Sequence, residues 1–135
     1  VSTQAQLLIL LQSLQRDMGL TLIFITHDLG VASFLCQEIA IMYLGRIVET
    51  GPTDAVLNAP AHPYSAALRA AAPQFFEPLS EPLSGEIPSP LNLPEGCRFS
   101  TRCASAQNDC RLKDPQLGKL SLQRAVACLH PLALK

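Results

Sequence analysis

Four cysteines near the end of the chain are the residues best suited to chemistry. Cys97, Cys103, Cys110 and Cys128 follow one another with five, six and seventeen residues between them. Thiolates are soft ligands for zinc and for iron–sulfur clusters, and in a cytosolic protein such a group favours metal over disulfides. Zinc ribbons usually present paired C-x2-C knuckles, which are absent here. The spacing favours metal, with plain thiols and disulfides as alternatives, and His130 is a further candidate ligand.

A histidine that follows an apolar run is the second chemical candidate. The run Leu20–Ile25 is typical of a strand buried on both faces of a parallel sheet. Ligands of open α/β sheets lie just beyond the carboxyl ends of such strands, which is where His27 stands. The alternative is a structural histidine at the end of a strand. We expect Asp28 to cap the next helix or to be a structural partner, not to act in catalysis.

The elements that would position these residues alternate between helices and strands. Thr3 and Gln6 form a capping-box pattern at the start of one helix, and Gly19 suits the left-handed position at its end. Pro63 is a favourable first residue for another helix. We expect helices over residues 3–18, 28–36, 52–58 and 63–72, a strand over 20–25, and a hairpin of strands 38–43 and 46–50 that turns at Leu44 and Gly45.

The composition narrows the functional classes. The 135 residues are 48% hydrophobic but only 5% aromatic, and their net charge is −1, so no electrostatic footprint for nucleic acid or anionic lipid is visible. No apolar run approaches the length of a membrane span, and no signal-peptide pattern is present. Six prolines between residues 73 and 94 predict an extended linker or arm, because proline fixes φ and lacks an N–H donor.

Three stretches together resemble one protein family. Thr-His-Asp-Leu-Gly at positions 26–30 resembles the switch-histidine segment of ABC-transporter ATPases, and residues 38–53 resemble the hairpin that closes their nucleotide-binding core. His62-Pro63-Tyr64 resembles the start of the C-terminal extension of oligopeptide/dipeptide transporter ATPases. The resemblance implies that His27 contacts the γ-phosphate of ATP as a catalytic residue. It also implies that Cys97, Cys103, Cys110 and Cys128 hold a 4Fe-4S cluster, with zinc as the alternative. No chemistry is assigned to His62.

The resemblance implies a fold and a division of the chain. We expect an α/β fold that is part of an ABC-ATPase core, with a parallel strand, flanking helices, a terminal hairpin, and an irregular Pro- and Cys-rich extension. Residues 1–60 would form the C-terminal part of the nucleotide-binding domain, residues 61–95 a helix and Pro-rich linker, and residues 96–135 the metal-cluster segment. Four arginines would offset the charge of the thiolates: Arg98, Arg102, Arg111 and Arg124.

The family also implies an activity and partners. The intact protein would be an ATPase that uses ATP and magnesium to energise peptide uptake, at the cytoplasmic face of the cell membrane. Its partners would be a second ATPase subunit, two transmembrane permeases and, indirectly, a substrate-binding protein. The sequence has no initiator Met and no GxxxxGK[ST] phosphate loop, so we expect a C-terminal piece that is inactive alone. The alternatives are a stand-alone metal-cluster module and an ABC ATPase for another solute such as nickel.

Overall fold

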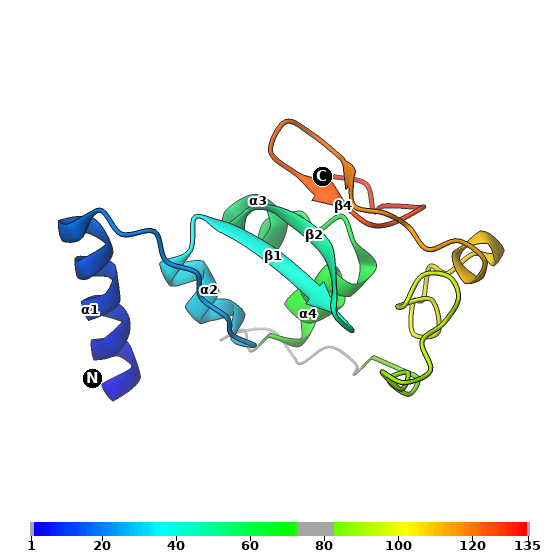
Figure 1. Ribbon diagram of the computed structural model, residues 1–135, viewed down its shortest axis with the longest axis horizontal. Helices are drawn as coiled ribbons and strands as arrows, with labels where there is room; N and C mark the ends of the chain where they lie inside the picture. Colours follow the sequence, from blue (N-terminus) through cyan, green and yellow to red (C-terminus); the bar gives the residue numbers. More distant parts are fainter. Residues whose placement is uncertain (1, 73–82, 135) are drawn as a thin grey trace. The chain divides into compact units, whose positions relative to one another are not determined.

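The computed structural model describes residues 2–72 and 83–134 and has a mixed α/β structure (Figure 1). The chain divides into two compact units, one that ends at Gln37 and one that begins at Glu38. The three segments expected from the sequence stay a prediction, and the second unit contains residues of all three. Among the described residues, no helix has the length and apolar character that crossing a lipid bilayer requires.

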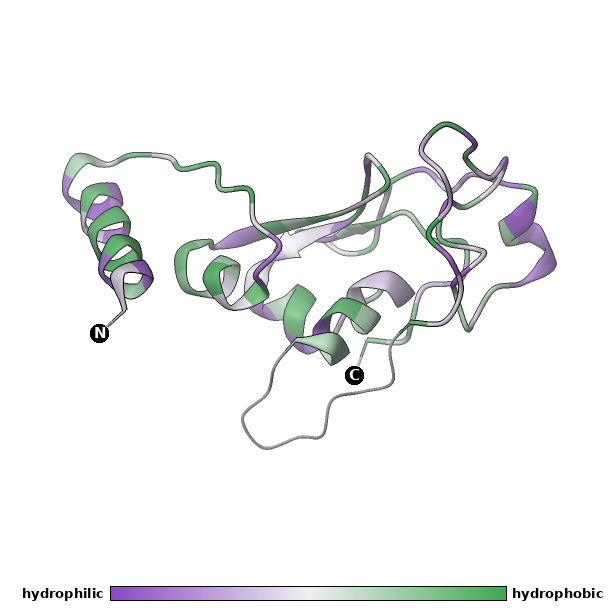
Figure 2. Cartoon of the chain, turned by 90° about the horizontal axis from the view of Figure 1, so that it is seen from below, coloured by the Kyte–Doolittle hydropathy of each residue, from purple (hydrophilic) through white to green (hydrophobic). Residues whose placement is uncertain are grey.

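The first unit contains two helices. Helix α1 spans Thr3–Met18 and ends as expected at Gly19, whose φ of 64° is left-handed. The cap at its start is Ser2, whose side chain accepts a hydrogen bond from the amide of Ala5, so the expected capping box at Thr3 and Gln6 is wrong. Helix α2 spans Leu29–Leu35. Figure 2 shows apolar and polar colours side by side along α1.

The predicted parallel strand over residues 20–25 is wrong. The structure assigns this segment to neither strand nor helix, and the side chains of Ile23 and Ile25 are each 93% exposed. A strand requires a neighbour that completes its ladder of backbone hydrogen bonds and a layer that covers its apolar faces. No strand among the described residues pairs with this segment, so the apolar run alone does not produce a strand. The described sheet is antiparallel throughout.

The second unit is built on the predicted hairpin. Strand β1 (Glu38–Tyr43) pairs antiparallel with β2 (Arg46–Pro52), and the register shifts between Ile41 and Met42. Leu44 and Gly45 both have positive φ, at 44° and 76°, which is the backbone of a tight two-residue hairpin turn. The predicted hairpin and its turn are confirmed.

Two short helices and two very short strands complete the second unit. Helix α3 (Thr53–Asn58) and helix α4 (Pro63–Ala71) match the predicted helices to within a residue. Strand β4 (Ala125–Val126) joins β2, and β3 (Gly118–Lys119) joins β4, which gives the order β1-β2-β4-β3. The 3₁₀ helix η1 covers Asn108–Arg111. Of the Pro-rich stretch, residues 83–94 contain no helix or strand, and residues 73–82 lie outside the described residues.

An aromatic cluster joins the C-terminal extension to the hairpin. The ring of Phe99, which is 2% exposed, lies 5.3 Å from the rings of both Tyr43 and Tyr64, measured between centroids. Tyr43 belongs to β1 and Tyr64 to α4, and their own rings are 4.6 Å apart. Each such aromatic pair adds about 0.5–1.5 kcal/mol beyond its buried area. Phe99 therefore fixes the cysteine-rich segment to the hairpin two residues after Cys97.

Candidate functional site

His27 lies in the short segment that leads into α2. The hydroxyl of Thr26 accepts a hydrogen bond from the amide of Asp28, at 3.0 Å. The carboxylate of Asp28 accepts from the amides of Gly30 and Val31, at 2.8 and 3.1 Å. This confirms Asp28 as the helix cap, while His27 between the two capping residues is exposed. The hydrogen bonds of Thr26 and Asp28 hold the backbone on both sides of His27. Because His27 itself is exposed, its ring is open to a ligand.

A close backbone contact brings Cys97 and Cys110 together. The amide of Cys97 donates to the carbonyl of Cys110, at 2.8 Å. Gly96 makes this possible, because a Cβ atom at position 96 would lie 2.4 Å from the Cys110 carbonyl oxygen and 2.5 Å from the carbonyl carbon of Arg111. Only a residue without a side chain fits between these two backbone segments. Gly96 is thus part of the framework of the cysteine group.

The four C-terminal cysteines line one cavity. Thirty residues separate Cys97 from Cys128 in the sequence, yet both contribute to this lining. All four cysteines are free thiols. The polar residues that share the lining with them are His62, Ser100, Ser105 and His130.

The spacing of the sulfur atoms separates two kinds of metal centre. In a tetrahedral zinc site with Zn–S bonds of about 2.3 Å, the sulfurs stand about 3.8 Å apart. Among the described residues, the one group of three or more such ligand atoms all within 4.8 Å of one another is Asp109, Cys110 and His130. No three cysteine sulfurs meet that limit. In a four-iron cluster each cysteine binds its own iron, which holds the sulfurs further apart. Four free thiols around one cavity are a donor set that suits either kind of centre.

Burial favours the neutral form of three of the thiols, those of Cys97, Cys103 and Cys128. Burial raises the pKa of Cys128 to about 11, and the neighbouring cysteines add to the rise. It raises the pKa of Cys97 and Cys103 as well. The amides of Phe99, Ser105 and His130, each two residues after a cysteine, partly offset these increases in pKa. Amides aimed at sulfur stabilise thiolates, and a cationic centre between the sulfurs would remove the remaining cost of their charge.

His130 is paired with an acid beside the cavity. Its Nε2 atom lies 2.9 Å from both carboxylate oxygens of Asp109. The hydrogen bond from His130 lowers the pKa of Asp109. Asp109 directly precedes Cys110, and the three side chains form the compact group described above. His130, the outside candidate from the sequence, is thus held at the edge of the cysteine group by Asp109.

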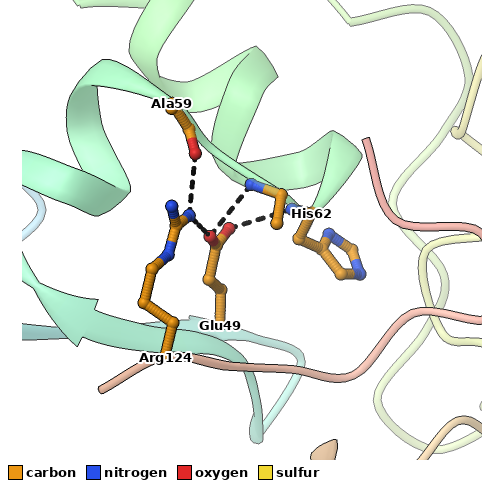
Figure 3. A network of polar contacts seen from close by, with 5 residues as sticks. Glu49, Ala59, His62 and Arg124 are labelled. Carbon is orange, nitrogen blue, oxygen red and sulfur yellow. Dashed lines mark hydrogen bonds and ion pairs between the residues drawn. The ribbon is translucent and has the colours of Figure 1, made fainter. Parts of the chain in front are cut away.

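A buried ion pair fastens the extension to β2 (Figure 3). The Glu49 carboxylate, fully buried, accepts from the amides of Ala61 and His62 at 2.9 Å and from Arg124 at 2.6 Å. The same arginine nitrogen donates to the carbonyl of Ala59, at 2.7 Å. Gly51 leaves room for Arg124, because a Cβ atom at position 51 would lie 2.7 Å from the Cγ atom of Arg124. Arg124 therefore completes a network that joins β2, the α3–α4 connection and the extension.

The arginines differ from their expected roles beside the thiolates. Arg124 pairs with Glu49, Arg98 donates to the carbonyl of Leu44, and Arg102 donates to the carbonyl of Leu83. Arg111 is exposed. The expectation for Arg124 and Arg98 is wrong because backbone carbonyls and a buried carboxylate compete for guanidinium groups, and the short β4 strand aligns Arg124 with Glu49.

Sequence reasoning missed three residues that build the site. Gly96 had a readable signal, since a glycine directly before a candidate ligand indicates a close backbone approach. Glu49 also had one, because an acid that directly follows the apolar pair Ile47 and Val48 in a predicted strand needs a partner if it is buried. His62 was given no chemistry, but its ring lines the cysteine cavity. Its place before a proline at a helix start indicated a cap, and nothing local indicated the cavity.

Comparison with known proteins assigns the chain to a class. Residues 48–110 match the model of the oligopeptide/dipeptide transporter C-terminal region. The chain is 51% identical over 132 residues to a probable peptide ABC transporter ATP-binding protein of Sinorhizobium fredii, which covers 95% of this chain and 37% of the relative. It is 47% identical over 134 residues to the oligopeptide transport ATP-binding protein OppF of Salmonella typhimurium, covering 96% and 40%.

A third relative, the dipeptide transport ATP-binding protein DppF of Haemophilus influenzae, is 41% identical over 133 residues, covering 96% of this chain and 41% of that protein. The class that these relatives define is the ATP-binding protein of an ABC transporter. Within it, residues 48–110 match the C-terminal region of the oligopeptide/dipeptide type, and the resemblance stated from the sequence is confirmed. The chain spans about two-fifths of the length of these relatives.

Proposed function

We propose that this chain is the C-terminal part of the ATP-hydrolysing subunit that energises peptide uptake by an ABC importer. The observation that carries the proposal is the similarity, over at least 95% of the chain, to relatives named as peptide-transport ATP-binding proteins. The intact protein would bind ATP and magnesium at the cytoplasmic face of the membrane. It would work with a second ATPase subunit and two permeases, and indirectly with a substrate-binding protein.

His27 is proposed as the residue that acts on the γ-phosphate. Its support is the Thr-His-Asp-Leu-Gly sequence and an exposed ring between two residues whose hydrogen bonds hold the backbone. A histidine in such a place donates a hydrogen bond to the transferring phosphoryl group and helps to hold the attacking water. Phosphoryl transfer depends mainly on positioning and on stabilisation of charge. The role of His27 would therefore be to stabilise the transition state.

The test is the steady-state ATPase rate of the full-length subunit in its transporter. The variant His27→Ala should hydrolyse ATP about 10² to 10³-fold more slowly while its ATP affinity is kept, as on removing one transition-state donor. The matched control is Asp28→Asn, which keeps an oxygen that caps α2 and should leave the rate near that of wild type. Near-normal turnover by His27→Ala would make His27 structural, and a slow Asp28→Asn would implicate the Asp28 carboxylate.

A second function, metal binding by the extension, is favoured by the shared cavity of the four cysteines. We infer that Cys97, Cys103, Cys110 and Cys128 hold a 4Fe-4S cluster. The support is their place around one cavity and the backbone amides that face three of the four sulfurs. Bound there, the cluster would supply cationic iron to four thiolates. The segment has little regular structure of its own, with η1 and two two-residue strands. The cluster would therefore act as a staple that holds the extension together.

A further inference from the structure

His62 is the N-cap residue of α4, and its two ring nitrogens have different roles. The Nδ1 atom accepts a hydrogen bond from the amide of Tyr64, at 3.0 Å, and so caps the helix. A neutral imidazole that accepts at Nδ1 carries its proton at Nε2. Burial lowers the pKa of His62 to about 4, against the opposing influence of Glu49 and the Ala127 carbonyl. At neutral pH the ring is therefore uncharged, with one N–H left to donate.

That N–H is buried without a partner. The His62 side chain is 1% exposed, and its Nε2 atom makes no hydrogen bond with any described residue. The backbone of Ala127 is the nearest candidate acceptor and raises the pKa of the ring, but the contact falls outside the distance and angle limits of a hydrogen bond. Figure 3 shows the ring pointing away from the Glu49 carboxylate. An incompletely satisfied buried donor costs free energy, so a well-placed acceptor in the cavity would stabilise this arrangement.

The surroundings of the ring indicate the kind of acceptor. His62 lines the same cavity as Cys97, Cys103, Cys110 and Cys128. The ring of Phe99, 5.9 Å away between centroids, covers it on another side and leaves no polar group there. The polar groups that share the cavity lining are the four thiols, two serines (Ser100 and Ser105) and His130. Of these, sulfur becomes the strongest acceptor once it carries the negative charge of a thiolate or a sulfide.

We propose that the Nε2–H group of His62 donates a hydrogen bond to a sulfur atom of the iron–sulfur cluster held by the four cysteines. This inference rests on the cluster proposed above. Hydrogen bonds to the sulfurs of a cluster stabilise its reduced, more negative state and raise its reduction potential. His62 is thus a tuning and positioning residue: one nitrogen caps α4, and the other links that helix to the cluster.

Two substitutions separate the two nitrogens. His62→Asn keeps an oxygen near the position of Nδ1, where it can still cap α4, but has no atom near Nε2. His62→Gln can place an amide N–H near the position of Nε2 but loses the cap acceptor. Ser65→Ala is the matched control, because Ser65 is a buried residue of the same helix whose hydroxyl also lacks a partner, and it does not line the cavity.

The experiment uses the full-length protein, prepared anaerobically and reconstituted with iron and sulfide. Iron and sulfide are counted per chain, and the reduction potential is followed by electron paramagnetic resonance. His62→Asn should shift the potential to more negative values and lose its cluster faster in air. His62→Gln and Ser65→Ala should stay near wild type in potential. A His62→Asn potential equal to that of wild type would overturn the inference alone, as would a His62→Gln shift equal to that of His62→Asn. Wild-type protein that takes up no iron and sulfide would overturn the cluster and this inference together.

Discussion

The Glu49–Arg124 pair makes a prediction about the attachment of the extension. In Arg124→Met the side chain keeps an unbranched stem about as long as the apolar part of arginine but loses the guanidinium group. The Glu49 carboxylate, fully buried, would retain two amide donors and lose the only cation that contacts it among the described residues. Removing one partner of a buried ion pair costs about 3–5 kcal/mol, because the remaining charge is left uncompensated.

A second ion pair in the same unit is the matched control. Arg46 is the first residue of β2, and its Nη2 atom lies 2.6 Å from the Oδ2 atom of Asp114. The Nη2 atom of Arg124 lies at the same distance from the Oε1 atom of Glu49. The side chains of Arg46 and Asp114 are 36% and 31% exposed, so solvent screens their attraction. Such exposed pairs contribute about 0–1 kcal/mol. Arg46→Met should therefore loosen the extension far less than Arg124→Met does.

The assay is hydrogen–deuterium exchange on the full-length protein. The amides of Ala127 and Leu132 report on the attachment, since they donate to the carbonyls of Val48 and Ala61, each at 2.8 Å. A loss of about 3–5 kcal/mol should speed their exchange by about 10² to 10³-fold or more, under conditions where the segment closes faster than an open amide exchanges. Adding Glu49→Gln to Arg124→Met should recover part of the protection, because the double variant buries no charge. Equal exchange in Arg124→Met and Arg46→Met would refute the reasoning.

Two further predictions concern the site and its pH dependence. Gly96→Ala should lower the free energy of unfolding by about 1–3 kcal/mol, because the new Cβ atom would overlap the carbonyls of Cys110 and Arg111. Urea unfolding measures this loss, and a stability equal to wild type would show that the two backbone segments can separate freely. Burial lowers the pKa of His62 from 6.5 to about 4 in the folded protein, so as the pH falls the unfolded chain takes up a proton first. The free energy of unfolding should therefore fall as the pH drops from 6.5 to 4, by up to about 3 kcal/mol. The comparison is with His62→Asn, whose unfolding free energy should fall less between pH 6.5 and 4; identical pH profiles would contradict this.

Local signals in the sequence were sufficient for several elements of both units. The Leu44-Gly45 turn, the proline that opens α4 and the cap at Asp28 were all predicted, because each depends on residues close in sequence. Gly19 is a further case, since its left-handed φ needs only the end of a helix. The Ser2 cap was missed because Thr3 next to it carries a similar hydroxyl.

Features that depend on distant partners were predicted less well. The run 20–25 has the composition of a buried strand, yet strand formation depends on neighbours that the run itself does not specify. The pairing of Arg124 with Glu49 depends on β4, which is two residues long and leaves almost no pattern in the sequence. The convergence of the four cysteines was predicted from their chemistry, because one centre requires it, whereas the part of His62 in the same cavity has no local signal.

The central claim about the site is that the four cysteines bind one metal centre. The most direct measurement is the content of iron, labile sulfide and zinc in anaerobically prepared full-length protein, compared with a Cys128→Ser variant. Four irons and four sulfides per chain are expected in wild type, with a loss of the intact cluster in Cys128→Ser. Stoichiometric zinc with no sulfide would replace the cluster with a zinc site. Wild-type protein that retains neither metal after reconstitution, with all four thiols open to alkylation, would contradict the claim.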